Sequence, residues 1–152
     1  MKPADLYHSG IVVDDVDATM RWLTDTAGYR WCDPYAGDQL IETPAGERTL
    51  PFHIAYTMDE PRLELLATVP GTCWVPSTSG IHHLGYWSDD VDRDVATLVA
   101  NGLQVEARAP NPDGSSLWAY CKGPIGTRIE LVSRTLEPLM TPWFTTGHSP
   151  LL

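Results

Sequence analysis

The sequence has few cysteines, an acidic charge balance and no long apolar run. Its three cysteines are odd in number and form no CxxC pair, which argues against a disulfide framework or a thiolate zinc site. Ten Lys and Arg residues against 20 Asp and Glu residues give a net charge of -10, which argues against a nucleic-acid partner. No window approaches the roughly 20 apolar residues of a membrane span, and residues 1–10 lack an apolar signal core. We therefore expect a cytoplasmic protein with no membrane or nucleic-acid partner.

An internal repeat organises the chain of 152 residues. Residues 8–17, HSGIVVDDVD, align without a gap to residues 83–92, HLGYWSDDVD. Each copy begins with His-x-Gly, continues as an apolar run of strand length and ends in Asp-Asp-Val-Asp. Aspartates accept hydrogen bonds from the free N–H groups of a first helical turn. Each copy therefore predicts a strand followed by a helix.

The residues after each copy repeat the same order of elements. Both halves show an apolar helix face that ends at a glycine, formed by Val16, Met20, Leu23 and Ala27 before Gly28, and by Val91, Val95 and Leu98 before Gly102. Strand-like runs follow at 30–32, 50–58 and 62–68 in the first half, and at 104–107, 116–122 and 127–133 in the second. The predicted fold class is α+β, with two tandem βαβββ modules.

These elements predict a single domain over residues 1–134. Module 1 covers about 6–69 and module 2 about 81–134, while the Pro-, Ser-, Thr- and Gly-rich stretch 70–80 is a linker. Residues 135–152 form a C-terminal tail outside the repeat. The polar stretch 33–48 is expected to be a loop over a cavity.

Four polar residues occupy matching places in the two modules. His8 and His83 lie on the first strand of each module, and Glu64 and Glu130 lie on the last, each glutamate between apolar neighbours. A single such glutamate would be read as pointing to solvent from a strand with one wet face, because burying a lone carboxylate is costly. Four residues in repeat register instead predict a shared site. Two imidazoles and two carboxylates suit one divalent metal ion, without choosing among Zn, Ni, Co, Mn and Fe.

On these residues the sequence resembles the vicinal oxygen chelate superfamily, the group of glyoxalase I and methylmalonyl-CoA epimerase. The resemblance covers about residues 6–134 and is carried by His8 in YHSG, Glu64 in LEL, His83 in HHLG and Glu130 in IEL. It implies that the two modules form a curved mixed sheet around a metal cavity. It also implies proton abstraction next to a carbonyl, with the metal stabilising the enolate.

Two kinds of residue are candidates for the catalytic base, a histidine and a glutamate. If the turn before the last strand of module 1 is Asp59-Glu60 alone, period-two alternation places His53 on the face of Glu64. A turn one residue longer would reverse that face, and His53 would then be a half-buried strand residue. An imidazole is a credible base near neutral pH. In glyoxalase I a metal-bound glutamate is the base, which by resemblance implies Glu130 or Glu64.

Other residues have weaker assignments. His82 alternates away from His83 and is expected to be a surface or interface histidine. Four aromatic residues could line a pocket for a ring-bearing substrate or pack in the core: Trp118, Tyr120, Trp143 and Phe144. Five basic residues could hold an anionic substrate group or be solvated charges: Arg48, Arg62, Arg108, Lys122 and Arg128.

Three function classes follow from the resemblance. The leading one is a metal-dependent epimerase or isomerase of a small carbonyl or acyl-thioester substrate, or a glyoxalase-like lyase. A ligand-binding protein of the antibiotic-resistance type is the alternative on the same fold. An extradiol-type dioxygenase is disfavoured, because those enzymes carry their ligands in one module and this chain divides them two and two. Open sheet edges favour a homodimer, and the site could be formed within one chain or between two.

Overall fold

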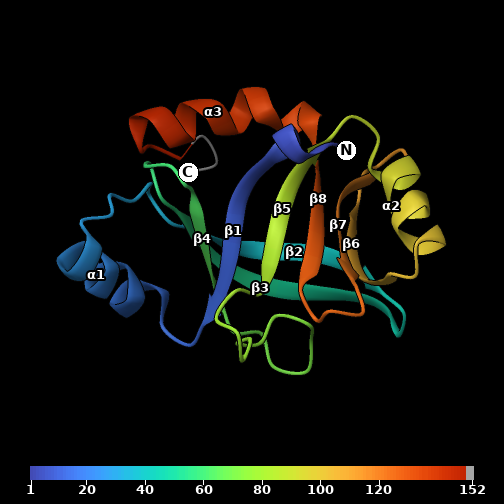
Figure 1. The fold of residues 1–152 in the computed structure, drawn as a ribbon, viewed down its shortest axis with the longest axis horizontal. Helices are drawn as coiled ribbons and strands as arrows, with labels where there is room; N and C mark the ends of the chain where they lie inside the picture. The colour runs from blue at the N-terminus through green and yellow to red at the C-terminus, as the bar shows by residue number, and fades with distance from the viewer. Residues whose placement is uncertain (150–152) are drawn as a thin grey trace.

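Eight strands close into a barrel in the computed structural model, which describes residues 1–149. The strands are β1 Leu6–Val13, β2 Tyr35–Thr43, β3 Gly46–Tyr56, β4 Leu63–Ala67, β5 His83–Ser88, β6 Gln104–Pro110, β7 Ser116–Lys122 and β8 Arg128–Ser133. Their order around the barrel is β1-β4-β3-β2-β6-β7-β8-β5 (Figure 1). Each module thus supplies one half of the wall. The predicted α+β fold of two βαβββ modules is confirmed.

The two modules join through their first strands. β1 runs parallel to β4, and β5 runs parallel to β8. β1 and β5 pair antiparallel, with His8 opposite Gly85 and Gly10 opposite His83. Closure occurs within one chain, so the open edges that favoured a homodimer are absent from the barrel of the described residues, and the homodimer remains a prediction without that support.

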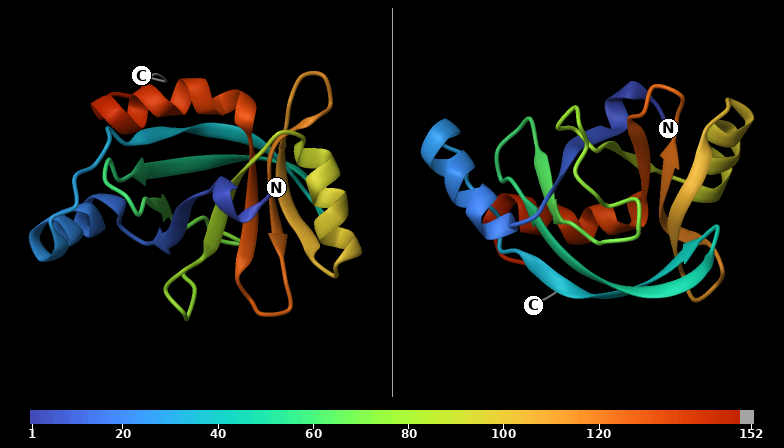
Figure 2. Two further views of the ribbon diagram at one scale, coloured as in Figure 1. Left: turned by 45° about the horizontal axis from the view of Figure 1, so that its top comes forward. Right: turned by 90° about the horizontal axis from the view of Figure 1, so that it is seen from below.

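Helices α1 Val16–Ala27 and α2 Val91–Ala100 pack outside the barrel, at opposite sides of it (Figures 1 and 2). Asp15 and Asp90 cap them by accepting hydrogen bonds from the third backbone N–H that follows. Gly28 ends α1 in the left-handed conformation at φ 77°, which glycine adopts without a Cβ penalty. The repeated Asp-Asp-Val-Asp segment is therefore a helix start in both modules.

The second strand of module 1 differs from its prediction. Residues 33–48 were expected to form a loop, yet most of them belong to β2 and the start of β3. The predicted strand at 30–32 contributes only an isolated bridge between Trp31 and Thr57. The apolar signal of β2 is weak because Ile41 is its one fully buried residue, while the side chains around it are exposed or half-buried.

The hairpin register places His53 on the wrong face for a base. Tyr56 pairs with Glu64 and Ile54 with Leu66, so the two-residue turn assumed for this hairpin is wrong. Proline cannot donate to a ladder, and Met58, which that turn would pair with Pro61, donates its N–H to the Arg30 carbonyl instead. Because one residue of slip reverses the faces, His53 lies on the face opposite Glu64.

The linker and the tail both carry structure. Trp74, in the predicted linker, is fully buried against Phe52, Trp118 and Tyr120. The predicted tail forms the short 3-10 helix η2 Arg134–Leu136 and the helix α3 Glu137–Thr146, which runs across one end of the barrel (Figure 1). The last residues of that tail, 150–152, lie outside the described residues.

Short helix η1 Pro3–Asp5 precedes β1. None of the helices within residues 1–149 combines the length and apolarity that a membrane span requires.

Candidate metal centre

Four side chains from four strands converge inside the barrel. His8 of β1, Glu64 of β4, His83 of β5 and Glu130 of β8 are each at most 5% exposed. Their donor atoms all lie within 4.8 Å of one another. The Nε2 atoms of the two histidines are 2.9 Å apart. All four residues belong to one chain, two from each module.

The spacing of these donors fits a shared divalent cation. Glu64 Oε2 lies 2.9 Å from His83 Nε2 and 3.5 Å from His8 Nε2, and Glu130 Oε2 lies 3.3 Å and 3.0 Å from the same atoms. Donors roughly 2.0–2.2 Å from one cation stand about 2.8–3.6 Å apart in octahedral or tetrahedral sites. Among the described residues, neither buried Oε2 has a partner with hydrogen-bond geometry. Buried acceptors without partners are rare, so the donor set favours a bound cation.

A glycine from the opposite module makes room for each histidine ring. A Cβ built on Gly85 would overlap the imidazole of His8, and a Cβ built on Gly10 would overlap that of His83. These are the glycines of the repeated His-x-Gly motif, and they stand directly opposite the histidines across the β1–β5 pair. The motif therefore supplies one candidate metal ligand from its own strand and the space for the candidate ligand of the other strand.

The cluster is strongly coupled electrostatically. Burial alone would lower the pKa of His8, but the Glu64 and Glu130 carboxylates outweigh it and raise the pKa to about 9. Burial alone would raise the pKa of Glu130, but its contacts with His8 and His83 hold it well below its ordinary value. The pKa of Glu64 is likewise lowered despite its burial, chiefly by the charge of His8. Both carboxylates are therefore ionised near neutral pH, and a cation that binds at the cluster would replace the proton held by His8.

A tyrosine lies opposite each glutamate on the neighbouring strand. Tyr56 pairs with Glu64 and Tyr120 pairs with Glu130. The Tyr56 hydroxyl donates to Glu64 Oε1. Burial first, and then the neighbouring carboxylates, raise the pKa of both tyrosines well above its ordinary value. The two-residue turn that put His53 on the face of Glu64 placed Tyr56 on the opposite face, and so missed it.

His82 is buried behind His83, so its expected surface position is wrong. It is 0% exposed, and it precedes β5, where strand alternation does not apply. Its Nε2 lies 2.7 Å from the Cys73 carbonyl, and its Nδ1 lies 3.0 Å from His83 Nδ1. A carbonyl only accepts, so His82 Nε2 carries the proton and its Nδ1 accepts from His83. Burial lowers the pKa of His82 to about 4, which keeps it neutral in this relay.

This relay fixes which nitrogen of His83 faces the cluster. With His83 Nδ1–H donated to His82, the lone pair of Nε2 points toward the glutamates, which is the form that binds a metal. His8 has no such support, since its buried Nδ1 lacks a hydrogen-bond partner among the described residues.

A cavity of about 400 Å³ opens beside the cluster, within the roughly 300–1,000 Å³ range of small-molecule sites. Both glutamates line it, together with three of the four aromatic residues considered from the sequence, Trp118, Tyr120 and Trp143. Phe144 packs behind it under the Arg62 guanidinium, 4.1 Å from the ring centre. His53 is not one of the described residues that line the cavity.

The basic residues considered for an anionic group are not gathered at the cavity. Arg128 pairs with Glu106 and Arg108 lies near Glu42. Arg48 donates to the carbonyl of Gly71 in the linker.

Comparisons with known proteins agree with this architecture. A point mutant of methylmalonyl-CoA epimerase from Streptomyces coelicolor, in complex with 2-nitronate-propionyl-CoA, is 22% identical with a TM-score of 0.56, over 85% of this chain and 96% of that chain. The epimerase from Mycobacterium tuberculosis is 20% identical with a TM-score of 0.53, over 85% and 87%. A mutant 4-hydroxymandelate synthase from Streptomyces coelicolor is 21% identical with a TM-score of 0.56, over 88% of this chain and 39% of that chain.

Because these structures are only 20–22% identical to this chain, their similarity establishes the fold alone. A search of curated proteins returned no match. A family model matches residues 7–121, most of the chain, and this matched stretch contains His8, Glu64 and His83. The chain belongs to the Glyoxalase/Bleomycin resistance protein/Dioxygenase superfamily.

Proposed function

We propose that the chain is a divalent-metal-dependent enzyme that removes a proton next to a carbonyl, as an epimerase or isomerase. One observation carries the proposal: four buried residues of metal-binding type cluster beside a largely apolar cavity, and the two carboxylates among them line it. A ligand-binding protein needs such a cavity but has no use for a complete set of metal donors.

Glu130 is the proposed base. Its side chain is 7% exposed, against 2% for Glu64. Glu64 is further occupied by the hydroxyl of Tyr56 at Oε1. Glu130 is therefore the carboxylate more open to a substrate in the cavity, while Glu64 serves as a ligand held in place.

The reaction of the chain's own residues balances without a further reactant. The Glu130 carboxylate takes the proton from the carbon next to the carbonyl, and the electron pair of that C–H bond moves onto the carbonyl oxygen. Glu130 then returns the proton to the same carbon after the enolate has turned its other face toward it, which is epimerisation, or to the adjacent carbon, which is isomerisation. A divalent cation, when bound, supplies Lewis-acid stabilisation of the negative charge that develops on oxygen.

The surrounding residues exclude water and hold the donors. Tyr7, Tyr56 and Tyr120 surround the glutamates, and α3 covers the cavity with Met140 and Trp143. Excluding water strengthens the electrostatic interactions within the site. The similar epimerase structures hold methylmalonyl-CoA or a nitronate analogue of propionyl-CoA. These ligands are acyl-thioesters, and so belong to the class of carbonyl compounds that this proposal requires. The cation is one of Zn, Ni, Co, Mn or Fe.

Deuterium wash-in tests this function. Metal-loaded protein in heavy water, given single-enantiomer benzoin or methylmalonyl-CoA, is expected to exchange the hydrogen next to the carbonyl of at least one of them. Glu130→Gln is expected to reduce exchange about 100-fold or more relative to Glu64→Gln, with metal content measured in both variants. Equal exchange in the two variants would remove Glu130 as the base. No exchange with either substrate would leave a ligand-binding role.

A further inference from the structure

The cavity beside the metal centre is lined mainly by apolar side chains. Aromatic and aliphatic side chains form its walls, among them Phe52 and Trp118 from the barrel and Leu139 and Trp143 from α3. Its polar groups are tyrosine hydroxyls, the Gln39 amide and the two glutamates. Among residues 1–149, no Lys, Arg or His side chain lines it.

With a divalent cation bound, the charges of the metal centre beside the cavity would be balanced. Two carboxylates and two neutral imidazoles would offset a divalent cation, leaving no net positive charge for a second anionic group. An acidic group brought into the cavity would therefore lie near Glu64 and Glu130 without a cation of its own. Burying an unpaired charge is costly, and like charges raise that cost.

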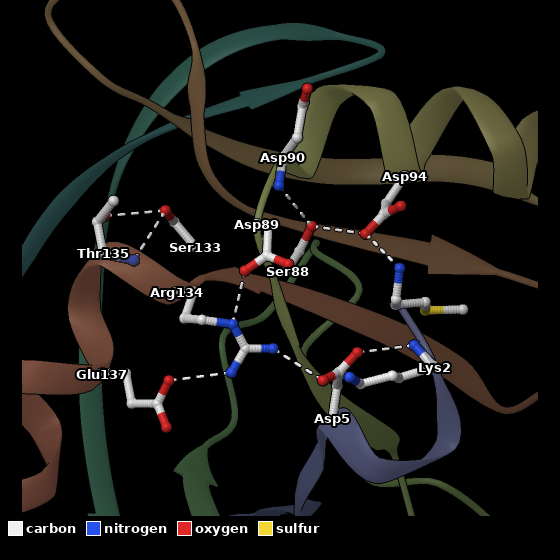
Figure 3. A network of polar contacts seen from close by, with 11 residues as sticks. Lys2, Asp5, Ser88, Asp89, Asp90, Asp94, Ser133, Arg134, Thr135 and Glu137 are labelled. Carbon is white, nitrogen blue, oxygen red and sulfur yellow. Dashed lines mark hydrogen bonds and ion pairs between the residues drawn. The ribbon is translucent and has the colours of Figure 1, made fainter.

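Two basic side chains that contact α3 are engaged elsewhere. Arg134 begins η2, just before α3, but its three nitrogens contact Asp89 at 2.7 Å, Asp5 at 2.8 Å and Glu137 at 3.0 Å (Figure 3). Arg62 lies over the Phe144 ring, and its Nε donates to the Thr57 carbonyl. Neither guanidinium is free to meet a substrate carboxylate or phosphate.

We propose that the cavity takes a neutral, ring-bearing carbonyl compound and discriminates against acidic acyl compounds. The ring lies among Phe52, Trp118 and Trp143, where aromatic side chains offer large apolar contact. The carbonyl oxygen faces the metal centre. This inference rests on the proposed function for the position of that oxygen, whereas the preference for a neutral ring rests on the lining alone.

Leu139, on the helix α3 that covers the cavity, is the position that sets this selectivity. It lines the cavity and is 39% exposed, so a long cationic side chain can be placed there without burying its charge. Thr141 lies on the same helix, is exposed and does not line the cavity. Thr141→Arg is therefore a matched control for Leu139→Arg with the same added charge.

Binding of matched probes to the metal-loaded protein tests the inference. Calorimetry should show benzoin binding at least tenfold more tightly than para-carboxybenzoin, and more tightly than methylmalonyl-CoA. Leu139→Arg should shift the ratio at least fivefold toward para-carboxybenzoin, and Thr141→Arg should leave it unchanged. Equal or tighter binding of either acid by the unaltered protein, or no binding of benzoin, overturns the inference.

These outcomes are separable from those of the proposed function. Tight and selective benzoin binding without deuterium exchange would sink the proposed enzyme and leave the assignment of the cavity standing. Exchange with methylmalonyl-CoA, together with poor benzoin binding, would sink this inference and leave the proposed enzyme standing. An equal shift of the binding ratio in both arginine variants would show that Leu139 does not set selectivity.

Discussion

The two motif glycines give the sharpest test of how the site is built. In Gly85→Ala, the new Cβ would overlap the His8 imidazole, with three ring atoms well inside contact distance. The ring has no room to yield, because His8 is 2% exposed and packs edge-on against Tyr7 and Tyr56. Either the strands separate or the ring leaves its position.

The size of the effect follows from this overlap. Overpacking a rigid core site costs about 1–3 kcal/mol, which lowers Tm by roughly 2–4 °C per kcal/mol in a chain of this size. A displaced His8 also removes one of four metal donors. Since changes behind a ligand already cost about 10–100-fold in metal affinity, loss of a ligand should cost at least about 100-fold.

Urea unfolding of the metal-free protein and calorimetric metal titration measure the two effects. Gly10→Ala should act in the same way through His83. Gly123→Ala is the control, since its Cβ would meet Leu103 at an ordinary 3.5 Å. Metal affinity and stability in Gly85→Ala equal to those of Gly123→Ala would refute the reciprocal packing of glycine and histidine.

Three further results are expected. His82→Phe should weaken metal binding about 10–100-fold in chelator competition, because His83 Nδ1 loses its acceptor; unchanged affinity would contradict the relay. Tyr56→Phe should destabilise the metal-free protein by about 1–3 kcal/mol in urea, because buried Glu64 Oε1 loses its donor; no change would mean that the hydroxyl is not needed. Arg134→Met should lower Tm and speed hydrogen exchange in α3. Burial alone would raise the pKa of Asp5, but the Lys2 backbone and Arg134 lower it. The stabilisation of the fold by these contacts of Asp5 is therefore present above about pH 4 and is lost as the pH falls through the lowered pKa of Asp5. The Tm difference between wild type and Arg134→Met should therefore shrink in acid. A constant difference would argue against the ion pair.

The repeat explains why much of the fold could be predicted from the sequence. Matching His-x-Gly and Asp-Asp-Val-Asp segments predict the strand–helix start of both modules, and symmetry then relates Glu64 to Glu130. In module 2, β7 has the predicted bounds.

The errors arise where tertiary contacts override local pattern. β2 has little apolar alternation and is held by pairing with β3 along its whole length. The length of the turn after β3 is set by Met58 bonding to Arg30, a contact that the sequence does not reveal, and this error moved His53 to the wrong face.

The C-terminal helix is a second case. α3 contains Pro142, which disfavours a helix interior, and its stability comes from the burial of Trp143 and Phe144 against the barrel. Helical stability of this kind comes from packing rather than propensity. Likewise, His82 is buried by the Cys73 segment, which read as a plain linker.

Metal analysis of the purified protein tests the central claim most directly. After dialysis against each candidate divalent metal in turn and removal of free ions, elemental analysis should find about one ion per chain for at least one of them. His83→Ala, measured in parallel and shown to be folded, should retain none. Stoichiometric metal in His83→Ala, or no retained metal in the unaltered protein with any of the candidates, would contradict the assignment of His8, Glu64, His83 and Glu130 as a metal centre.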